Sequence, residues 1–140
     1  ARLRSDPARY VDTAVEEIVR WTSPVIQFGR TATRDVTIGG QQIRAGETVG
    51  LWYPSANRDE RQFDDPYRFD VGRTPNYHVG YGHGPHFCLG ANLARWELRA
   101  MFAELARRDV LDHLVIDGPG EWMTDLHVGG LSSQPVTVAT

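Results

Sequence analysis

The spacing of apolar residues near the start of the chain predicts an amphipathic helix over residues 6–21. Ser5 or Asp6, just ahead of a proline, provides a plausible cap and first turn. A second proline follows Ser23 and ends the helix, because a residue before proline is pushed out of the helical region. The apolar face consists of residues at three- and four-residue steps: Val11, Ala14, Val15, Ile18 and Trp21.

A stronger helical period begins after Cys88 and predicts the most regular helix of the chain. Arg107 and Arg108 fall in its last turn, where positive charge interacts favourably with the helix dipole. The apolar side of this helix consists of Leu89, Leu93, Ala94, Leu98, Met101, Phe102 and Leu105.

Between and after these helices the pattern changes to short β-like runs. Gly39-Gly40 is a good hairpin turn, so we expect a small antiparallel sheet. Gly129-Gly130 marks a bend between the last two runs. An irregular segment begins at Asp65 and continues almost unbroken to Gly84. Such a long irregular segment usually has a functional reason. The runs are residues 25–28, 36–38, 42–43, 49–53, 114–116 and 136–138.

Composition is that of an ordinary globular protein of one domain, with 140 residues, of which 41% are hydrophobic and 24% charged. The formal net charge of -3 gives no global attraction to nucleic acid or to an anionic membrane. No apolar run is long enough to span a bilayer, and the first residues lack the pattern of a signal peptide. We therefore expect a cytoplasmic protein with no nucleic-acid partner and no membrane span.

The candidate chemistry lies in the segment PNYHVGYGHGPHFCLGANLAR, residues 75–95, which contains the only cysteine, Cys88. A single cysteine excludes an internal disulfide and leaves an inert thiol, a nucleophile or a metal ligand. His78, His83 and His86 could complete a zinc site with this thiol. Structural zinc sites usually draw ligand pairs from two separate segments, whereas these four residues share one loop. No lysine and serine or threonine follow the glycines as a phosphate-binding loop requires.

Glu17 and Arg20 stand three residues apart on the first predicted helix. On spacing alone, a solvated ion pair on the helix surface is the favoured interpretation.

The segment from Tyr81 to Gly90, reading YGHGPHFCLG, resembles the haem-binding loop of the cytochrome P-450 monooxygenases, especially the soluble bacterial ones. Glu17 and Arg20 match the E-x-x-R helix of that family, and residues 65–69 match the segment whose arginine completes a structural triad. Three motifs in the family's order outweigh the surface-pair interpretation. The resemblance implies an α+β fold, mainly α, made of an E-x-x-R helix, a small antiparallel sheet, a meander, the cysteine loop with its following helix, and a C-terminal β-hairpin.

The resemblance also implies roles for individual residues. Cys88 would be the axial thiolate ligand of haem b iron, and the N–H groups of Leu89 and Gly90 would hydrogen-bond its sulfur. His86 and Arg30 match positions that contact haem propionates. Further cofactor contacts would come from Tyr81 and Gly82, and the structural triad would consist of Glu17, Arg20 and Arg68.

Tyr81 departs from the family pattern, which usually has phenylalanine at this position. Its ring can still shield the sulfur, but a buried hydroxyl needs a hydrogen-bond partner. The hydrogen bonding around the iron is therefore open, whereas ligation by Cys88 is not.

Substrate-pocket residues of the family match two apolar stretches of this chain. We expect a lipid-like or steroid-like substrate, since details of the sequence look similar to actinobacterial sterol and lipid hydroxylases. Filling of the core is an equally good interpretation of the first stretch. The pocket residues would be Val25, Ile26, Phe28, Gly130 and Leu131.

The resemblance further implies that residues 1–140 are the C-terminal portion of a longer enzyme. The family's oxygen-activating helix lies N-terminal to every motif found here, so we expect the fragment alone to be inactive. Electrons would come from a ferredoxin and its ferredoxin reductase. Arg95 and Arg99 together would form a basic docking surface, whereas for either arginine alone an ordinary solvated face is the favoured interpretation. A non-catalytic haem-binding or sensing domain is the alternative function, and a zinc or reactive-thiol protein is a remote one.

Overall fold

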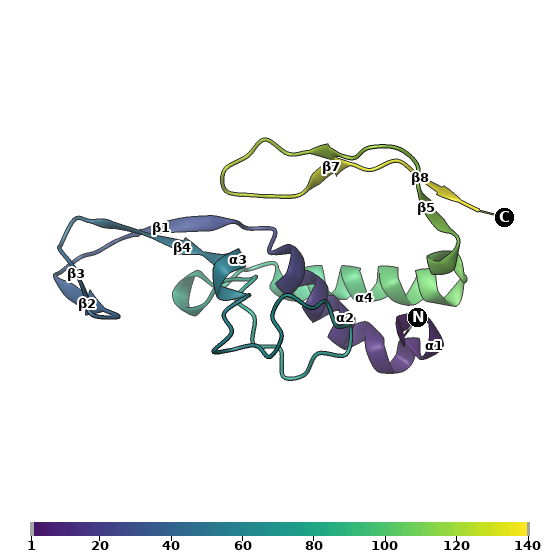
Figure 1. Cartoon of the computed structure of the whole chain (residues 1–140), viewed down its shortest axis with the longest axis horizontal. Helices are drawn as coiled ribbons and strands as arrows, with labels where there is room; N and C mark the ends of the chain where they lie inside the picture. Colours follow the sequence, from purple (N-terminus) through teal and green to yellow (C-terminus); the bar gives the residue numbers. More distant parts are fainter. Residues whose placement is uncertain (1, 140) are drawn as a thin grey trace.

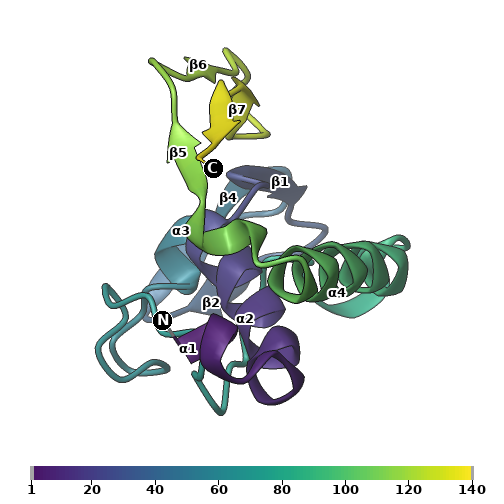
Figure 2. The same cartoon turned by 90° about the vertical axis from the view of Figure 1, so that its right-hand side faces the viewer.

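The computed structural model describes residues 2–139, and its two long helices lie side by side (Figures 1 and 2). A β-ribbon extends from one end of this pair, and a second β-structure at the C-terminal end of the chain runs along it (Figure 1). The elements in order are α1 (Arg2–Ser5), α2 (Pro7–Thr22), β1 (Gln27–Thr31), β2 (Val36–Ile38), β3 (Gln41–Ile43), β4 (Thr48–Trp52), α3 (Tyr53–Ala56), η1 (Gly84–His86), α4 (Ala91–Arg107), η2 (Val110–Asp112), β5 (Leu114–Ile116), β6 (Glu121–Trp122), β7 (Leu131–Ser133) and β8 (Val136–Val138).

Helix α2 begins and ends as its sequence predicts. The Asp6 carboxylate accepts a hydrogen bond from the Arg9 N–H, and proline occupies the first turn. At the other end, Ser23 adopts a left-handed conformation with φ 41° and its N–H donates to the Val19 carbonyl. The buried apolar residues of α2 are Ala14, Val15 and Val19.

The strands form antiparallel pairs rather than one small sheet. β1 pairs with β4 and β2 pairs with β3, so these four strands form a long ribbon. The expected run 25–28 was placed too early, because pairing begins at Gln27 opposite Trp52 and continues to Thr31. The turn at Gly39-Gly40 is confirmed, with φ of 55° and 80° in the region that favours glycine.

The C-terminal strands also pair as the pattern predicts. β5 pairs with β8, and β6 pairs with β7 around the bend that contains Gly129-Gly130. This hairpin contacts the exit of α2 through a bridge between Val25 and Val128. The α+β fold class predicted from the sequence is confirmed. Within residues 2–139, no helix is both long and apolar enough to cross a membrane.

Candidate cofactor site

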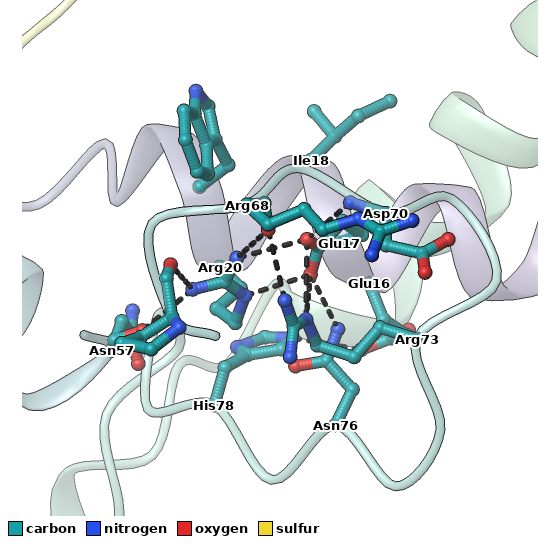
Figure 3. Close-up of polar contacts among 12 residues, drawn as sticks. Glu16, Glu17, Ile18, Arg20, Asn57, Arg68, Asp70, Arg73, Asn76 and His78 are labelled. Atoms are coloured by element: carbon teal, nitrogen blue, oxygen red, sulfur yellow. Dashed lines mark hydrogen bonds and ion pairs between the residues drawn. The ribbon is translucent and has the colours of Figure 1, made fainter. Parts of the chain in front are cut away.

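A buried polar cluster surrounds Glu17 beneath α2 (Figure 3). Glu17 and Arg20 are both 0% exposed and form a two-pronged ion pair, with Arg20 Nε 2.7 Å from Oε2 and Nη2 2.8 Å from Oε1. Arg20 also donates to the backbone carbonyls of Asn57, Pro66 and Arg68. The surface-pair interpretation favoured by spacing alone is therefore wrong. A fully buried ion pair is stable only when every donor has an acceptor, and the remaining donors of Arg20 find acceptors in distant parts of the chain.

The third side chain of this cluster is Arg73, not Arg68. Arg73 Nε lies 3.1 Å from Glu17 Oε2 (Figure 3). Its guanidinium also donates to the carbonyls of Asp64, Asp65 and Arg68. Arg68 contributes only its backbone carbonyl, while its exposed side chain forms no ion pair within residues 2–139. The predicted role of the Arg68 side chain is wrong, because the chain turns after Phe69 and brings a later arginine to the carboxylate.

Hydrogen bonds keep Glu17 ionised. Burial works to raise the pKa of its carboxyl, but donors from Arg20, from the Asp70 backbone and from Arg73 outweigh it and lower that pKa. The Asn76 amide adds a further hydrogen bond at 3.2 Å. Together these contacts tie α2 to the irregular segment after α3.

Asn57 is a structural residue that sequence reasoning missed. Its side chain is fully buried, its Nδ2 donates to Ser23 Oγ at 2.9 Å and its Oδ1 accepts from the Val79 N–H at 2.8 Å. The only signal in the sequence was a short run of turn-forming residues that gave no hint of burial. Asn57 connects the end of α2 to the segment that leads into the cysteine loop.

A second polar cluster, formed by Glu16, His78 and Arg95, lies beside this segment. The Glu16 carboxylate accepts from Arg95 Nε at 2.7 Å and Nη2 at 2.9 Å, and lies 3.0 Å from His78 Nε2. Partial burial works to raise the pKa of Glu16, but hydrogen bonds from His78 and Arg95 outweigh it and lower that pKa to about 2. These three residues come from α2, the irregular segment and α4.

The cysteine loop lines a largely apolar cavity of about 440 Å³. Cys88 and His86 contribute to its wall, and so do Tyr81 and Gly82. Gly82 has φ 74°, which a side chain would strain, and the Cys88 N–H donates to the Tyr81 carbonyl at 2.9 Å. Cys88 itself is exposed and lies three residues before α4, so the helix begins slightly later than predicted.

The immediate surroundings of the sulfur differ from expectation in one respect. Gly90 faces the thiol, since a Cβ added there would lie 4.0 Å from Cys88 Sγ. Within residues 2–139, however, no N–H donates to this sulfur, so the predicted hydrogen bonds from Leu89 and Gly90 are not formed.

The Tyr81 hydroxyl is buried and finds no hydrogen-bond partner in the described part of the chain. Burial raises the pKa of this phenol, although the nearby Arg95 acts in the opposite direction. The tyrosine ring packs between Arg95, 4.5 Å from its centroid, and the Phe87 ring at 6.4 Å. The hydrogen-bond partner that a buried Tyr81 hydroxyl needs is therefore not found among residues 2–139.

The other residues that were predicted to contact the cofactor or the substrate line three different cavities. Val25 and Phe28 line the Cys88 cavity. Arg30 lines an adjacent cavity of about 280 Å³ that shares Tyr53 with the first, and its Nη1 donates to the Gly29 carbonyl. A third cavity, between the end of α2 and the C-terminal hairpin, is lined by Ile26, Gly130 and Leu131.

The chemistry of the Cys88 cavity fits a haem better than a zinc ion. No three His, Cys, Asp or Glu side chains in residues 2–139 gather as a metal site, so the zinc ligand set is not assembled. His78 is instead held by Glu16. A single soft sulfur donor on an apolar wall suits iron within a flat apolar ring, and the His86 imidazole beside it suits a carboxylate.

Arg95 and Arg99 are less available to a partner than their sequence pattern suggests. Arg95 is paired with Glu16, and Arg99 Nε lies 2.8 Å from Asp12 Oδ1 on α2. Both arginines therefore join the two helices, and reversing their charge would disturb this contact as well as any docking surface.

Comparison with known proteins identifies the relatives of this chain. The family model described as Cytochrome P-450 matches residues 7–111. A methyl-branched lipid omega-hydroxylase from Mycobacterium tuberculosis is 51% identical over 126 residues, covering 89% of this chain and 29% of the relative. A steroid C26-monooxygenase from Mycolicibacterium smegmatis is 46% identical over 123 residues, covering 88% and 31% respectively. The chain thus spans less than a third of the length of these relatives.

Solved structures agree with this fold. A cytochrome P-450 from Bacillus megaterium in complex with testosterone has a TM-score of 0.87 and 36% identity, covering 96% of this chain and 37% of that one. The cytochrome P-450 BioI, solved with a hexadec-9Z-enoic acid ligated acyl carrier protein, has a TM-score of 0.91 and 38% identity, covering 98% and 35%.

Proposed function

Since this chain belongs to the cytochrome P-450 family, we propose that it is the C-terminal, haem-holding portion of a haem-thiolate monooxygenase. The observation that carries this proposal is the position of Cys88 on the wall of an apolar cavity, beside His86. The cofactor is haem, and we assign it as haem b, which has no covalent link to the chain. When bound, haem supplies the iron that binds and activates dioxygen.

The residues of this chain have separate tasks in that site. Cys88 binds the iron as a thiolate, and Gly82 lets the loop backbone approach the ring without a side chain in the way. His86 binds one cofactor carboxylate, and Arg30 binds the other from the adjacent cavity. The Glu17 cluster holds the irregular segment against α2 and so keeps the loop in place.

We propose an apolar substrate of the lipid or steroid class. The apolar lining of the Cys88 cavity, with Val25 and Phe28, supports this class, and so do the names of the two mycobacterial relatives. Ile26, Gly130 and Leu131 line a separate cavity and are assigned to substrate only if the complete enzyme joins the two.

The proposed enzyme needs two partners. The first is the N-terminal part of the same protein, which would cover the exposed apolar side chains Leu93 and Trp96 on α4, at 63% and 73% exposure. The second is an electron donor, for which we propose a ferredoxin with its ferredoxin reductase.

An absorption spectrum of the reduced, carbon-monoxide-bound full-length protein tests this function. We expect a Soret band at the position typical of thiolate ligation. Cys88→Ser should abolish that band, because serine offers iron a hard hydroxyl in place of a soft thiolate. His86→Ala should weaken haem retention while leaving the band in position.

Two results would contradict the proposal. A band typical of histidine ligation, or no haem uptake by the full-length protein, would remove the haem-thiolate assignment. A thiolate band without product formation, in the presence of dioxygen, a lipid or steroid and reduced ferredoxin, would instead favour the non-catalytic haem-binding alternative.

A further inference from the structure

The Glu16 cluster, formed by Glu16, His78 and Arg95, differs from the exposed ion pairs of this chain. The His78 side chain is only 2% exposed, and those of Glu16 and Arg95 are 24% and 22% exposed. One carboxylate receives three hydrogen bonds from two different segments. Charge-assisted hydrogen bonds in such partly buried positions are stronger and more directional than those of solvated pairs.

The hydrogen bonds around His78 fix the orientation of its ring. The Gly80 N–H donates to His78 Nδ1 at 3.1 Å, so this nitrogen carries no proton. The proton is then on Nε2, which faces Glu16. Gly80 is required here, because a Cβ would approach the Val19 side chain within 2.7 Å.

The cluster reaches the cysteine loop through Tyr81. The Arg95 guanidinium lies 4.5 Å from the centroid of the tyrosine ring, and the His78 ring lies 5.9 Å from it. Two members of the cluster therefore hold this ring. The Tyr81 carbonyl accepts the hydrogen bond from the Cys88 N–H, which connects the held ring to the cysteine backbone.

We propose that Glu16, His78 and Arg95 act as positioning residues that hold Tyr81 and thereby order the loop that presents Cys88. None of the three lines the Cys88 cavity, so their effect on the cysteine passes through Tyr81. The consequence of this ordering for haem rests on the function proposed above, whereas the ordering of the loop does not.

A neighbouring ion pair offers a matched control. Asp12 and Arg99 also join α2 to α4, at 2.8 Å, one helical turn from Glu16 and Arg95 on the respective helices. This pair joins the same two helices but makes no hydrogen bond with residues 75–90. It therefore separates simple attachment of the helices from positioning of the loop.

The first test measures amide hydrogen exchange at Cys88 in haem-free full-length protein, by mass spectrometry of the peptide that contains it, because this N–H exchanges when its hydrogen bond to the Tyr81 carbonyl opens. In Glu16→Gln, one polar atom of the new amide becomes a donor that faces a donor from Arg95 or His78. We expect exchange of the Cys88 N–H to become about three- to tenfold faster, as the loop opens more often. Asp12→Asn should stay within a factor of about two of the wild type.

A second variant acts on the other side of the cluster. Arg95→Lys keeps the charge but loses the two-pronged hydrogen bond and the flat group over the Tyr81 ring. We expect faster exchange of the Cys88 N–H, as in Glu16→Gln. The double variant should be about as fast as the faster single variant, because both changes disable one unit and their effects do not add.

The second test uses the haem-loaded full-length protein. We expect Glu16→Gln to lower the fraction of the carbon-monoxide complex that shows the thiolate band, and Asp12→Asn to leave it unchanged. If Asp12→Asn matches Glu16→Gln in both measurements, or if neither differs from the wild type, the positioning role is wrong. If the wild type lacks the thiolate band, the proposed function fails, while the exchange rates of the Cys88 N–H still decide whether the cluster orders the loop.

Discussion

The Glu17 cluster and the Cys88 cavity both involve residues of the same irregular segment and have opposite character. The cluster is buried and polar, and its carboxylate receives hydrogen bonds from two arginines, an asparagine and a backbone N–H. The cavity is apolar, and the thiol at its wall receives no hydrogen bond within residues 2–139. The chain thus satisfies the buried Glu17–Arg20 pair and leaves the thiol on the ligand side without a hydrogen bond.

This difference separates stability from ligand binding. A buried ion pair cannot lose one partner without leaving an uncompensated charge, so the Glu17 cluster tolerates little change. An apolar wall with one sulfur tolerates substitution better, because its interactions are with a ligand rather than with the chain. Mutations in the cluster should therefore affect folding, and mutations of Cys88 should affect only what the cavity holds.

The largest effect is expected from Glu17→Gln. The substitution keeps the size of the side chain but leaves buried Arg20 without its counter-charge, which should cost about 3–5 kcal/mol of unfolding free energy. Urea denaturation of the full-length protein measures this loss. Glu104→Gln is the control, because Glu104 also pairs with two arginines but is exposed, and its denaturation midpoint should not change. Equal losses of unfolding free energy in the two variants would show that burial does not make the Glu17 cluster more stabilising than an exposed cluster.

The second largest effect is expected on acidification, which should lower the stability of the folded state by protonating Glu16. The pKa of Glu16 is lowered from its ordinary value of 4.5 to about 2, so its ionised form stabilises the folded state above pH 4.5. That contribution is lost as the pH falls from 4.5 towards 2, and at pH 3 we expect a loss of about 2 kcal/mol. The free energy of unfolding at pH 7 and pH 3 measures it. Glu16→Gln should reduce this pH dependence, and an unchanged dependence would contradict the lowered pKa.

A smaller effect distinguishes two arginines of the irregular segment. Arg73→Leu removes hydrogen bonds to Glu17 and to three carbonyls, and should cost about 2 kcal/mol. Arg68→Leu removes an exposed side chain and should change the stability by less than about 0.5 kcal/mol. Thermal or urea unfolding of both variants tests the assignment, and the reverse order would restore Arg68 to the triad.

These two arginines also show how far the sequence alone could be interpreted. The helix periods predict α2 and α4 well, because an amphipathic face is a local property of the chain. Glu17 and Arg20 are recognisable from their spacing once other motifs accompany them. Arg68 and Arg73 are not distinguishable in this way, because the choice depends on how an irregular segment turns, and its turns follow no periodic pattern.

The limits are similar at the candidate site. Cys88 and His86 are recognisable from a short motif whose residues are neighbours in the chain. The role of His78 depends on Glu16, which is 62 residues away in the sequence, so no local pattern reveals it. The division of Ile26 and Phe28 between two cavities likewise follows from the path of the chain after α2 and not from their apolar character.

The smallest effect is expected at Asn57, which connects the two regions that differ so strongly. Asn57→Ala leaves the Val79 N–H without its acceptor, removes the donor to Ser23 Oγ and should cost about 1–2 kcal/mol of unfolding free energy. Because Val79 leads directly into the cysteine loop, amide hydrogen exchange should become faster at Val79 than at α2 residues such as Val15. Ser55→Ala, at an exposed position on the short helix α3 that ends just before Asn57, is the control and should change neither measurement. Uniform acceleration at both sites would mean that the cluster and the loop unfold as one unit, and the separation of framework from ligand side would then not extend to their dynamics.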